Sequence, residues 1–381
     1  MEFIIESMYY IAENYPHSIV DNSYKDNLIV YLREIYKDNV DELDSILNLH
    51  LDELLISYNL IRSMNTFIRT YEEQINLRPD IVQIMEHIQS IEQPAQRTPE
   101  WYNFRYNHIT ASNAWKAYST KDKVKNQLIY EKCKPMNINK YNSTLIESPM
   151  SWGHKYEPLT IKLYEMINDT IISEFGCIEH IEHKFLAASP DGIVTGNNNY
   201  GRMIEVKNVV SRIITGIPKE DYYIQMQLQM EVCNLDECDF VETKFVEYEN
   251  YNDYLMDGSG CFTNDNKYKG IIKVYIKNNE YVYDYMDIHC SNIDEWLNSY
   301  NNEYEWFKNV YWKLDVYSCV YVPRCKLWFN KTLKDIEDLW KIVLIERENG
   351  EYIKREPIKR VKKEQVNSCL IQLNEKDIMN M

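Results

Sequence analysis

Long apolar runs are missing from this chain, although 45% of its 381 residues are hydrophobic. No stretch approaches the roughly 18 to 20 consecutive apolar residues that a membrane-spanning helix needs. The opening residues MEFIIESMYY also lack the basic region and the small-residue cleavage site of a secretory signal. The sequence therefore predicts a soluble, intracellular protein without a membrane partner, long enough for two or three folding units.

Paired cysteines are missing as well. The nine cysteines are odd in number and scattered, and none forms a C-x-x-C pair. This usage fits a reducing compartment better than a disulfide framework, and it disfavours zinc and iron–sulfur sites. The nearest metal-like pattern is Cys177, His180 and His183, whose three-residue spacing is more simply one face of a local turn or helix.

Positive charge is scarce, with 42 Lys and Arg against 59 Asp and Glu and a net charge of -17. This balance opposes binding to a polyanion, because nucleic-acid affinity comes largely from Lys and Arg that neutralise phosphates. The charge is uneven, since twelve acidic residues and only three basic ones lie in residues 1–60. A dipolar layout and two ordinary solvated helix faces both remain open. Basic residues crowd a tract near the C-terminus: Lys354, Arg355, Lys359, Arg360, Lys362 and Lys363.

Glycine and proline are few, at 10 and 11 residues, whereas tyrosine reaches 32. This bias is typical of AT-rich codon usage and indicates something about the genome rather than about chemistry. The fraction of charged residues, 27%, is ordinary for a globular protein.

Apolar periodicity divides the chain into three regions. Residues 1–95 repeat apolar side chains at spacings of three and four, which predicts a helical accessory region. Two prolines in the stretch 92–100 indicate a linker or domain entry. We expect the core at 96–290 and a helical C-terminal region with a basic tail at 291–381.

The core itself combines helical and strand periodicities, which predicts an α/β fold. Residues 100–170 favour helices around an irregular insert at 137–151, and a helix is expected at 222–233. The expected strands are 178–181, 184–188, 192–195, 202–207, 240–247 and two more within 270–285.

The strand Met203–Lys207 carries the chemistry. Side chains alternate across a strand, so Glu205 and Lys207 share one face. Folding the turn at 196–201 back as a hairpin brings Asp191 close to Glu205. Two carboxylates and a backbone carbonyl suit Mg²⁺, and an adjacent lysine can hold or help deprotonate a water, which is the equipment of phosphodiester hydrolysis. The alternative is an exposed hairpin with a chance Glu-x-Lys ion pair.

Five motifs in a particular order favour the hydrolytic site over a chance ion pair. They are Arg105 with Ile109-Thr110-Ala111-Ser112 after Arg97-Thr98-Pro99-Glu100-Trp101, then Gly153-His154-Lys155-Tyr156-Glu157, Ser189-Pro190-Asp191-Gly192, Glu205-Val206-Lys207, and Tyr223-Ile224-Gln225 running on to Met230. This order resembles the PD-(D/E)XK nuclease superfamily, and more closely the lambda-exonuclease and YqaJ-type viral recombinase family. The resemblance covers about 97–250 and implies a restriction-endonuclease-like α/β core, with a mixed central sheet flanked by helices.

The resemblance also implies a metal site. Asp191 and Glu205 would be metal ligands, Val206 would contribute its carbonyl, and Glu157 would complete the acidic shell directly or through water. The implied cofactor is Mg²⁺, with Mn²⁺ able to substitute. Glu157 as an ordinary acid on a helix surface is the alternative.

Further roles follow from the same resemblance. Lys207 would position the attacking water, and Gln225 would orient the site from its helix, although Gln229, one turn away, competes for that role. A plain polar helix residue is the alternative for Gln225.

Three other positions match those that hold a terminal 5′ phosphate in this family: Arg105, Ser112 and Ser189. A guanidinium forks onto phosphate oxygens and hydroxyls donate beside it. A surface arginine and an N-cap serine are the alternative. Arg212 lies near another basic position of the family, but its spacing after Lys207 is one residue short.

The resemblance implies a metal-dependent 5′ to 3′ exonuclease that resects duplex DNA ends in viral recombination or repair. The expected partners are double-stranded DNA ends, a single-strand-annealing recombination protein and further copies of the chain. The expected location is the host cytoplasm, a viral factory or the virion. Two alternatives remain: an endonuclease of the same superfamily, which the phosphate pocket disfavours, and a non-catalytic DNA-binding protein, which the intact acidic and lysine set disfavours.

Overall fold

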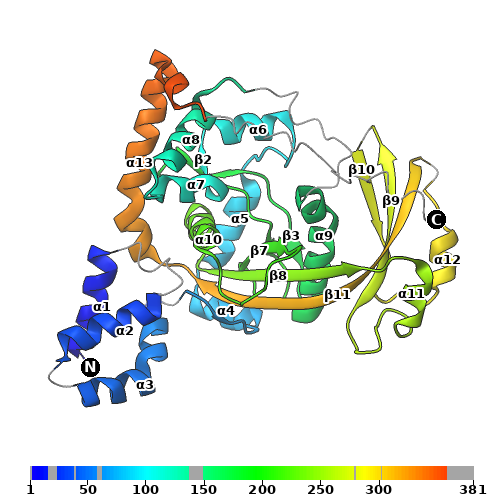
Figure 1. Ribbon diagram of the computed structural model, residues 1–381, viewed down its shortest axis with the longest axis horizontal. Helices are drawn as coiled ribbons and strands as arrows, with labels where there is room; N and C mark the ends of the chain where they lie inside the picture. The colour runs from blue at the N-terminus through cyan, green and yellow to red at the C-terminus, as the bar shows by residue number, and fades with distance from the viewer. Residues whose placement is uncertain are drawn as a thin grey trace, which may run out of the picture.

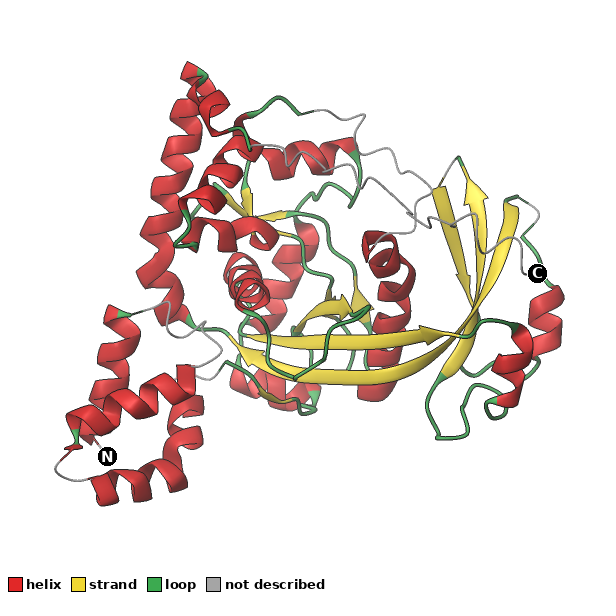
Figure 2. Cartoon of the chain, in the orientation of Figure 1, coloured by secondary structure: helices red, strands yellow, loops and turns green. Residues whose placement is uncertain are grey.

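The structure, a computed structural model, describes residues 2–15, 24–37, 40–57, 62–136, 149–278, 280–301 and 303–357. It confirms the predicted α/β class, because a curled mixed sheet crosses the middle of the molecule and helices flank it (Figures 1 and 2). The helices that the site discussion uses are α6 (Pro99–Tyr106), α7 (Ala111–Tyr118), α8 (Asp122–Cys133), α9 (Pro149–Asn168), α10 (Glu220–Cys233) and α13 (Lys326–Asn349). The others are α1 (Glu2–Asn14), α2 (Tyr24–Ile35), α3 (Val40–Ser57), α4 (Tyr71–Leu77), α5 (Ile81–Ser90), α11 (Tyr251–Met256), α12 (Ile293–Asn298) and the 3-10 turn Glu351–Arg355.

The main sheet has eight strands in the order β10-β9-β11-β8-β7-β6-β3, with β1 paired to β11. Strands β7 and β8 run parallel, and the other neighbours in this sheet run antiparallel. Its strands are β1 (Met64–Asn65), β3 (Ile172–Ser173), β6 (Gly192–Val194), β7 (Met203–Asn208), β8 (Glu237–Glu247), β9 (Lys269–Lys277), β10 (Glu280–Tyr285) and β11 (Glu305–Pro323). A three-stranded sheet contains β2 (Ile109–Thr110), β5 (Leu186–Ala188) and β4 (Ile178–Glu179).

Alternating side chains give β7 two different faces. Ile204 and Val206 pack with Tyr164 of α9 in one apolar cluster. On the other face the Glu205 carboxylate meets Gln225 of α10. The strand therefore presents an apolar face to α9 and its acidic side chain to α10, as period-two alternation requires.

The C-terminal region differs from the expected helical division. Residues 305–323 form β11, the long strand that pairs with both β8 and β9, before α13 begins at Lys326. Val310, Trp312 and Leu314 are buried at every second position, which is strand periodicity. Residues 64–65, in the N-terminal region, also join this sheet as β1. The sheet thus draws strands from outside 96–290.

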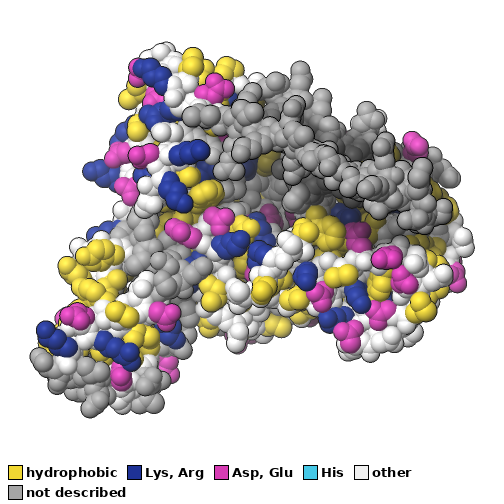
Figure 3. All heavy atoms as spheres, in the orientation of Figure 1, with side chains coloured by type: hydrophobic (Ala, Val, Ile, Leu, Met, Phe, Trp, Pro, Cys, Tyr) yellow, Lys and Arg dark blue, Asp and Glu magenta, His cyan; other side chains and the backbone are white. Residues whose placement is uncertain are grey.

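Charge is intermingled on the face drawn in Figure 3, where Lys and Arg side chains lie among Asp and Glu side chains. Of the C-terminal basic tract, Arg355 pairs with Glu346 of α13 at 2.6 Å, and Lys354 pairs with Glu351 at 2.6 Å. The tract from residue 358 onward lies outside the described residues. Within the described ranges, none of the helices has the length and apolar character to traverse a bilayer.

Candidate active site

Asp191 directly precedes β6. At this point the edge of β7 that pairs with β6 becomes free of backbone pairing to β6. Strands β6 and β7 form an antiparallel hairpin with Gly192 opposite Ile204. The Oδ2 atom of Asp191 accepts a hydrogen bond from the backbone N–H of Val206 at 2.8 Å. The carboxylate therefore caps the edge of β7 one step beyond the end of its β6 pairing.

The Val206 carbonyl faces the same edge as Asp191. Backbone groups of a strand return to one edge every second residue, and Ile204 already pairs with Gly192 there. The Val206 N–H points to this edge as well, because it donates to Asp191. Because β6 begins only at Gly192, its pairing with β7 does not extend to Val206. The Val206 carbonyl therefore lies beside the Asp191 carboxylate rather than in the β6 ladder.

Glu205 is fully buried and is held by three donors. Its Oε1 atom accepts from the Lys207 ammonium and from Gln225 Nε2 at 2.7 Å. Its Oε2 atom accepts from Gln229 Nε2 at 2.8 Å. A carboxylate has about four acceptor positions, so one remains on Glu205 for a further partner.

Both glutamines of α10 therefore contact Glu205. The sequence favoured Gln225 and treated Gln229, one helical turn away, as a competitor for the same role. Residues four apart share a helix face, so one α10 face supplies a donor to each carboxylate oxygen. Gln229 was absent from the expected site, although this spacing is the signal that could have included it.

Glu157 is the third acidic residue of the site, and it comes from α9. It projects from α9 into a cleft of about 460 Å³ that Asp191 and the loop Glu174–Gly176 also line. The charges of Lys207 and Glu205 both act on the Glu157 carboxyl. The structure thus brings Glu157, Asp191, Glu205 and Lys207 together from α9, the start of β6, and β7.

The charges at this site perturb one another. Burial, followed by the negative charge of Glu205, raises the pKa of Asp191 well above its ordinary value. Burial also raises the pKa of Glu157, and nearby Arg97 and Lys207 oppose that rise. Burial disfavours the Lys207 ammonium, but the Glu205 and Asp191 carboxylates outweigh it and raise the pKa of Lys207. Lys207 is therefore a firmly protonated donor rather than a free base.

These residues fit a hard divalent cation. Among the described residues no group of three or more His, Cys, Asp or Glu side chains is arranged to hold a metal ion. Mg²⁺ needs fewer, because it retains several waters and is often bound by one or two carboxylates. Asp191, the remaining acceptor position on Glu205 and the Val206 carbonyl supply oxygen ligands of that kind. The mutual repulsion that raises the pKa of Asp191 is the repulsion that a bound cation relieves.

The expected phosphate-binding residues are connected to one another. Arg105 Nη2 donates to Ser112 Oγ at 2.9 Å, and the Arg105 guanidinium stacks 4.3 Å from the centre of the Trp101 ring. Trp101 Nε1 reaches Ser189 Oγ at 3.5 Å. The Ser189 hydroxyl donates to the carbonyl of Gly176, which lines the acidic cleft. Helix α6, the start of α7 and the loop before β6 therefore bring these side chains to one side of the cleft.

Lys132 is a buried cation behind this group that the sequence did not single out. Its Nζ donates to the Arg105 carbonyl at 2.5 Å. Burial, followed by the charges of Arg105 and Arg347, lowers the pKa of Lys132 to about 7, against the opposing effects of Glu131 and Cys177. A lysine without periodic or motif context has no sequence signal for such a position.

The alternative patterns have structural explanations. His180 Nδ1 accepts from the backbone N–H groups of Glu182 and His183, each at 3.0 Å, so it stabilises a turn. Cys177 is buried. Arg212 pairs with Glu242 of β8 and lies 5.8 Å from the Tyr222 ring centre.

Comparison with known proteins finds a family model that matches the part of the chain carrying this site. Residues 100–236 match the family model described as the YqaJ-like viral recombinase domain. This part of the chain is therefore similar to the YqaJ-like viral recombinase domain. The YqaJ-like domain contains Glu157, Asp191, Glu205, Lys207 and both α10 glutamines.

A relative from Acanthamoeba polyphaga mimivirus, the uncharacterized protein R354, is 27% identical over 315 residues. The match covers 70% of this chain and 56% of that protein, so the chain spans little more than half the length of this relative. The chain is also similar to the alkaline exonuclease LHK-Exo from Laribacter hongkongensis, with 19% identity, a TM-score of 0.39, and coverage of 68% of this chain and 97% of that one. A phage-related exonuclease from Haemophilus somnus 129PT has 14% identity, a TM-score of 0.35, and coverage of 63% and 96%.

Proposed function

We propose that this chain is a Mg²⁺-dependent deoxyribonuclease that degrades duplex DNA from its ends in the 5′ to 3′ direction. The observation that carries the proposal is the junction of Asp191, Glu205 and the Val206 carbonyl at the open edge of β7, with the Lys207 ammonium on Glu205. The YqaJ-like domain, which holds all of these residues, supports the same conclusion. Mn²⁺, with similar oxygen preference, would substitute.

When bound, the cation supplies charge stabilisation at the phosphate and lowers the pKa of a water. Asp191 and Glu205 would hold it, together with the Val206 carbonyl, and Glu157 would act directly or through water. Lys207 is protonated, so it would orient the attacking water by donating a hydrogen bond rather than by accepting its proton. Gln225 and Gln229 each donate to one oxygen of the Glu205 carboxylate, which fixes its orientation.

End recognition would come from Arg105, Ser112 and Ser189. The Arg105–Ser112 contact and the ring of Trp101 preorganise a guanidinium and a hydroxyl for a terminal phosphate. This arrangement favours an exonuclease over an internally cutting endonuclease. The role would be in viral DNA recombination or repair inside the infected cell, together with a single-strand-annealing protein and further copies of this chain.

Linear and circular duplex DNA, incubated with the purified protein in Mg²⁺ or EDTA, test the proposal. We expect degradation of linear DNA in Mg²⁺ only, and circles should survive. Degradation of circles would establish the endonuclease alternative, and degradation of neither would establish a binding protein.

The proposed machinery is tested by Lys207→Ala, which should abolish turnover without unfolding the chain. Full activity in that variant would remove the mechanism. Arg105→Ala should erase any preference for 5′-phosphorylated over 5′-hydroxyl ends, and an unchanged preference would remove the end-recognition role.

A further inference from the structure

Arg97 occupies a backbone conformation that usually belongs to glycine. Its φ is +68°, in the left-handed region that a side chain other than Gly or Asn rarely adopts. It is the third residue of a turn closed by the Thr98 N–H, which donates to the Ala95 carbonyl at 3.3 Å. A turn with positive φ at this position normally carries Gly or Asn there. Retaining arginine therefore suggests a use for its side chain.

The turn is fastened to the wall of the acidic cleft. Gln93 accepts a hydrogen bond from the Gly176 N–H at 2.8 Å, and Gln96 donates to the Phe175 carbonyl at 3.2 Å. Thr98 then caps α6 by accepting from the Trp101 N–H at 3.2 Å. These contacts hold Arg97 at a fixed place between the cleft and the helix that carries Arg105.

The Arg97 side chain lines the same cleft as Asp191 and Glu157. Its charge acts on Glu157, whose burial-raised pKa it opposes, and on His154, whose pKa burial and Arg97 together lower. Yet the guanidinium makes no hydrogen bond or ion pair of 4.0 Å or less with any residue in the part of the chain that the structure describes, and Arg97 is exposed. Arg97 is thus a cation that lines the same cleft as the acids without forming an ion pair with them.

We propose that Arg97 binds a phosphate of the DNA strand that enters this cleft and steadies it opposite Asp191. This inference rests on the proposed nuclease function. A phosphodiester in the cleft would place negative oxygens between the acidic edge of β7 and the opposite wall, and the planar guanidinium can fork onto two of them. Arg97 would then be a second phosphate contact, separate from the end-binding group at Arg105.

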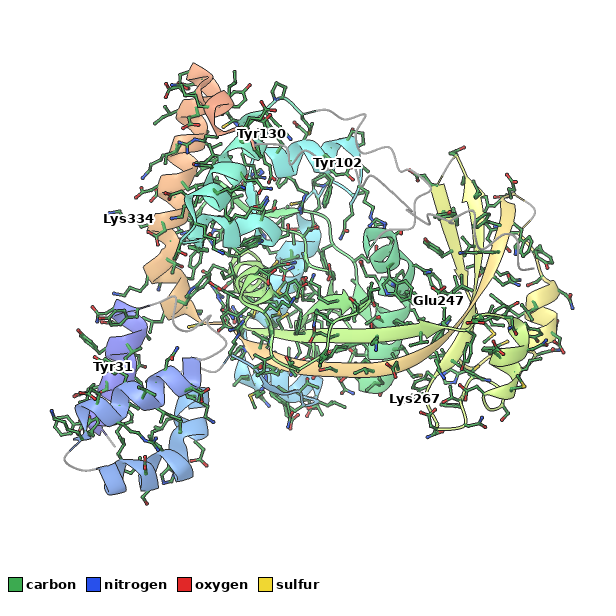
Figure 4. All side chains as sticks on the ribbon, viewed as in Figure 1. Tyr31, Tyr102, Tyr130, Glu247, Lys267 and Lys334 are labelled. Carbon is green, nitrogen blue, oxygen red and sulfur yellow. The ribbon has the colours of Figure 1, made fainter. Side chains whose placement is uncertain are left out.

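Arg97→Gly is the decisive variant because glycine suits φ +68°. We expect its melting temperature to equal or exceed that of the wild type. We expect kcat/KM on linear duplex DNA to fall by about 100-fold, the order seen when a single transition-state donor is removed. Arg97→Lys should recover part of this loss, since it restores the charge but not the fork. Lys334→Ala, on the outer helix α13 away from the cleft (Figure 4), should behave as wild type.

A merely structural role, as counter-ion to Glu157, predicts a different pattern. In that case Arg97→Gly would lower the melting temperature, and Glu157→Gln would restore it together with DNA binding. Binding to a duplex end in Ca²⁺ separates the two. A phosphate contact requires that adding Arg97→Gly to Glu157→Gln still weakens binding, by about 10-fold for one charged hydrogen-bonding group.

The outcomes for the two proposals are distinguishable. An active wild type with an equally active and equally tight-binding Arg97→Gly would overturn the inference and leave the nuclease function standing. Rescue of binding by Glu157→Gln would also overturn it. A wild type that neither cleaves nor binds DNA in Mg²⁺, Mn²⁺ or Ca²⁺ would remove the proposed function, and the role of Arg97 with it.

Discussion

Buried charge dominates the chemistry of individual residues here. Asp191 and Glu157 have raised pKa values because burial and neighbouring carboxylates oppose their ionised forms. Such repulsion destabilises the protein without a cation and favours cation binding, since ligand binding to the folded state adds to stability. Stability and function are therefore set against each other at this site.

The first prediction concerns Asp191→Asn. The amide oxygen can still accept from the Val206 N–H, while a buried negative charge is removed. We expect an unchanged or higher melting temperature in EDTA, a smaller rise of that temperature on adding Mg²⁺, and loss of DNA hydrolysis. Differential scanning calorimetry with and without Mg²⁺ checks this, and an undiminished Mg²⁺ effect would contradict the metal role of Asp191.

The second prediction concerns the pH dependence of stability at Lys132. Its pKa is about 7 in the folded chain against an ordinary 10.5, so unfolding takes up a proton between these values. This contribution to the free energy of unfolding is therefore absent above 10.5 and increasingly unfavourable as pH falls towards 7. Between these pH values, wild-type stability should rise with pH by up to about 1.4 kcal/mol per unit more steeply than that of Lys132→Met. Parallel urea-denaturation curves across that range would contradict it.

At the scale of elements, the hairpin β6–β7 decides where the acids meet. Gly192 begins β6 directly after Asp191, and a Cβ there would collide with the Ile172 side chain of β3 and approach Ile204 of β7 at 3.2 Å. The absence of a side chain lets β3, β6 and β7 close together. The position of Asp191 thus depends on close packing of short strands.

The third prediction is that Gly192→Val costs about 1–3 kcal/mol of stability, as overpacking does, and sharply lowers nuclease activity by moving Asp191. Gly153→Ala is the matched control, because a Cβ at Gly153 of α9 meets no atom within 4 Å. That helical substitution should raise stability by about 0.5–1 kcal/mol and preserve activity. Urea denaturation and a linear-DNA assay measure both; equal effects of the two substitutions would argue against the packing explanation.

At the scale of the whole molecule, a net charge of -17 must be reconciled with the proposed binding to DNA, a polyanion. We expect the attraction to come chiefly from Arg97 and Arg105, together with a divalent cation. The intermingled charges on the face in Figure 3 offer no broad basic surface there.

The fourth prediction follows from this distribution. The two phosphate contacts proposed for Arg97 and Arg105 give a slope of log affinity against log salt of about -2, since each contributes about 0.9. Fluorescence anisotropy with a short duplex in Ca²⁺ should give that value, and binding in EDTA should be much weaker. A slope near -8 would indicate many more phosphate contacts than Arg97 and Arg105 supply.

The local sequence pattern was enough to predict the geometry of those parts of the site whose residues lie close together in the sequence. The alternation of Glu205 and Lys207 and the return of Asp191 across a short turn follow from strand geometry, and the structure has that hairpin. The roles given to these residues remain predictions for the assays above. In contrast, β11 was mistaken for helix, because its Trp and Tyr residues suit either periodicity and its partners β8 and β9 lie far away in sequence.

The sequence by itself determined the α/β class, the acidic hairpin and the motif order, because each depends on residues near one another along the chain. Only the tertiary structure decided that Gln229 shares Glu205 with Gln225, that Lys132 contacts the Arg105 carbonyl, and that Arg97 and Asp191 line one cleft. Those relations join segments tens of residues apart. They arise from packing between helices and the sheet, which periodicity along the chain does not encode.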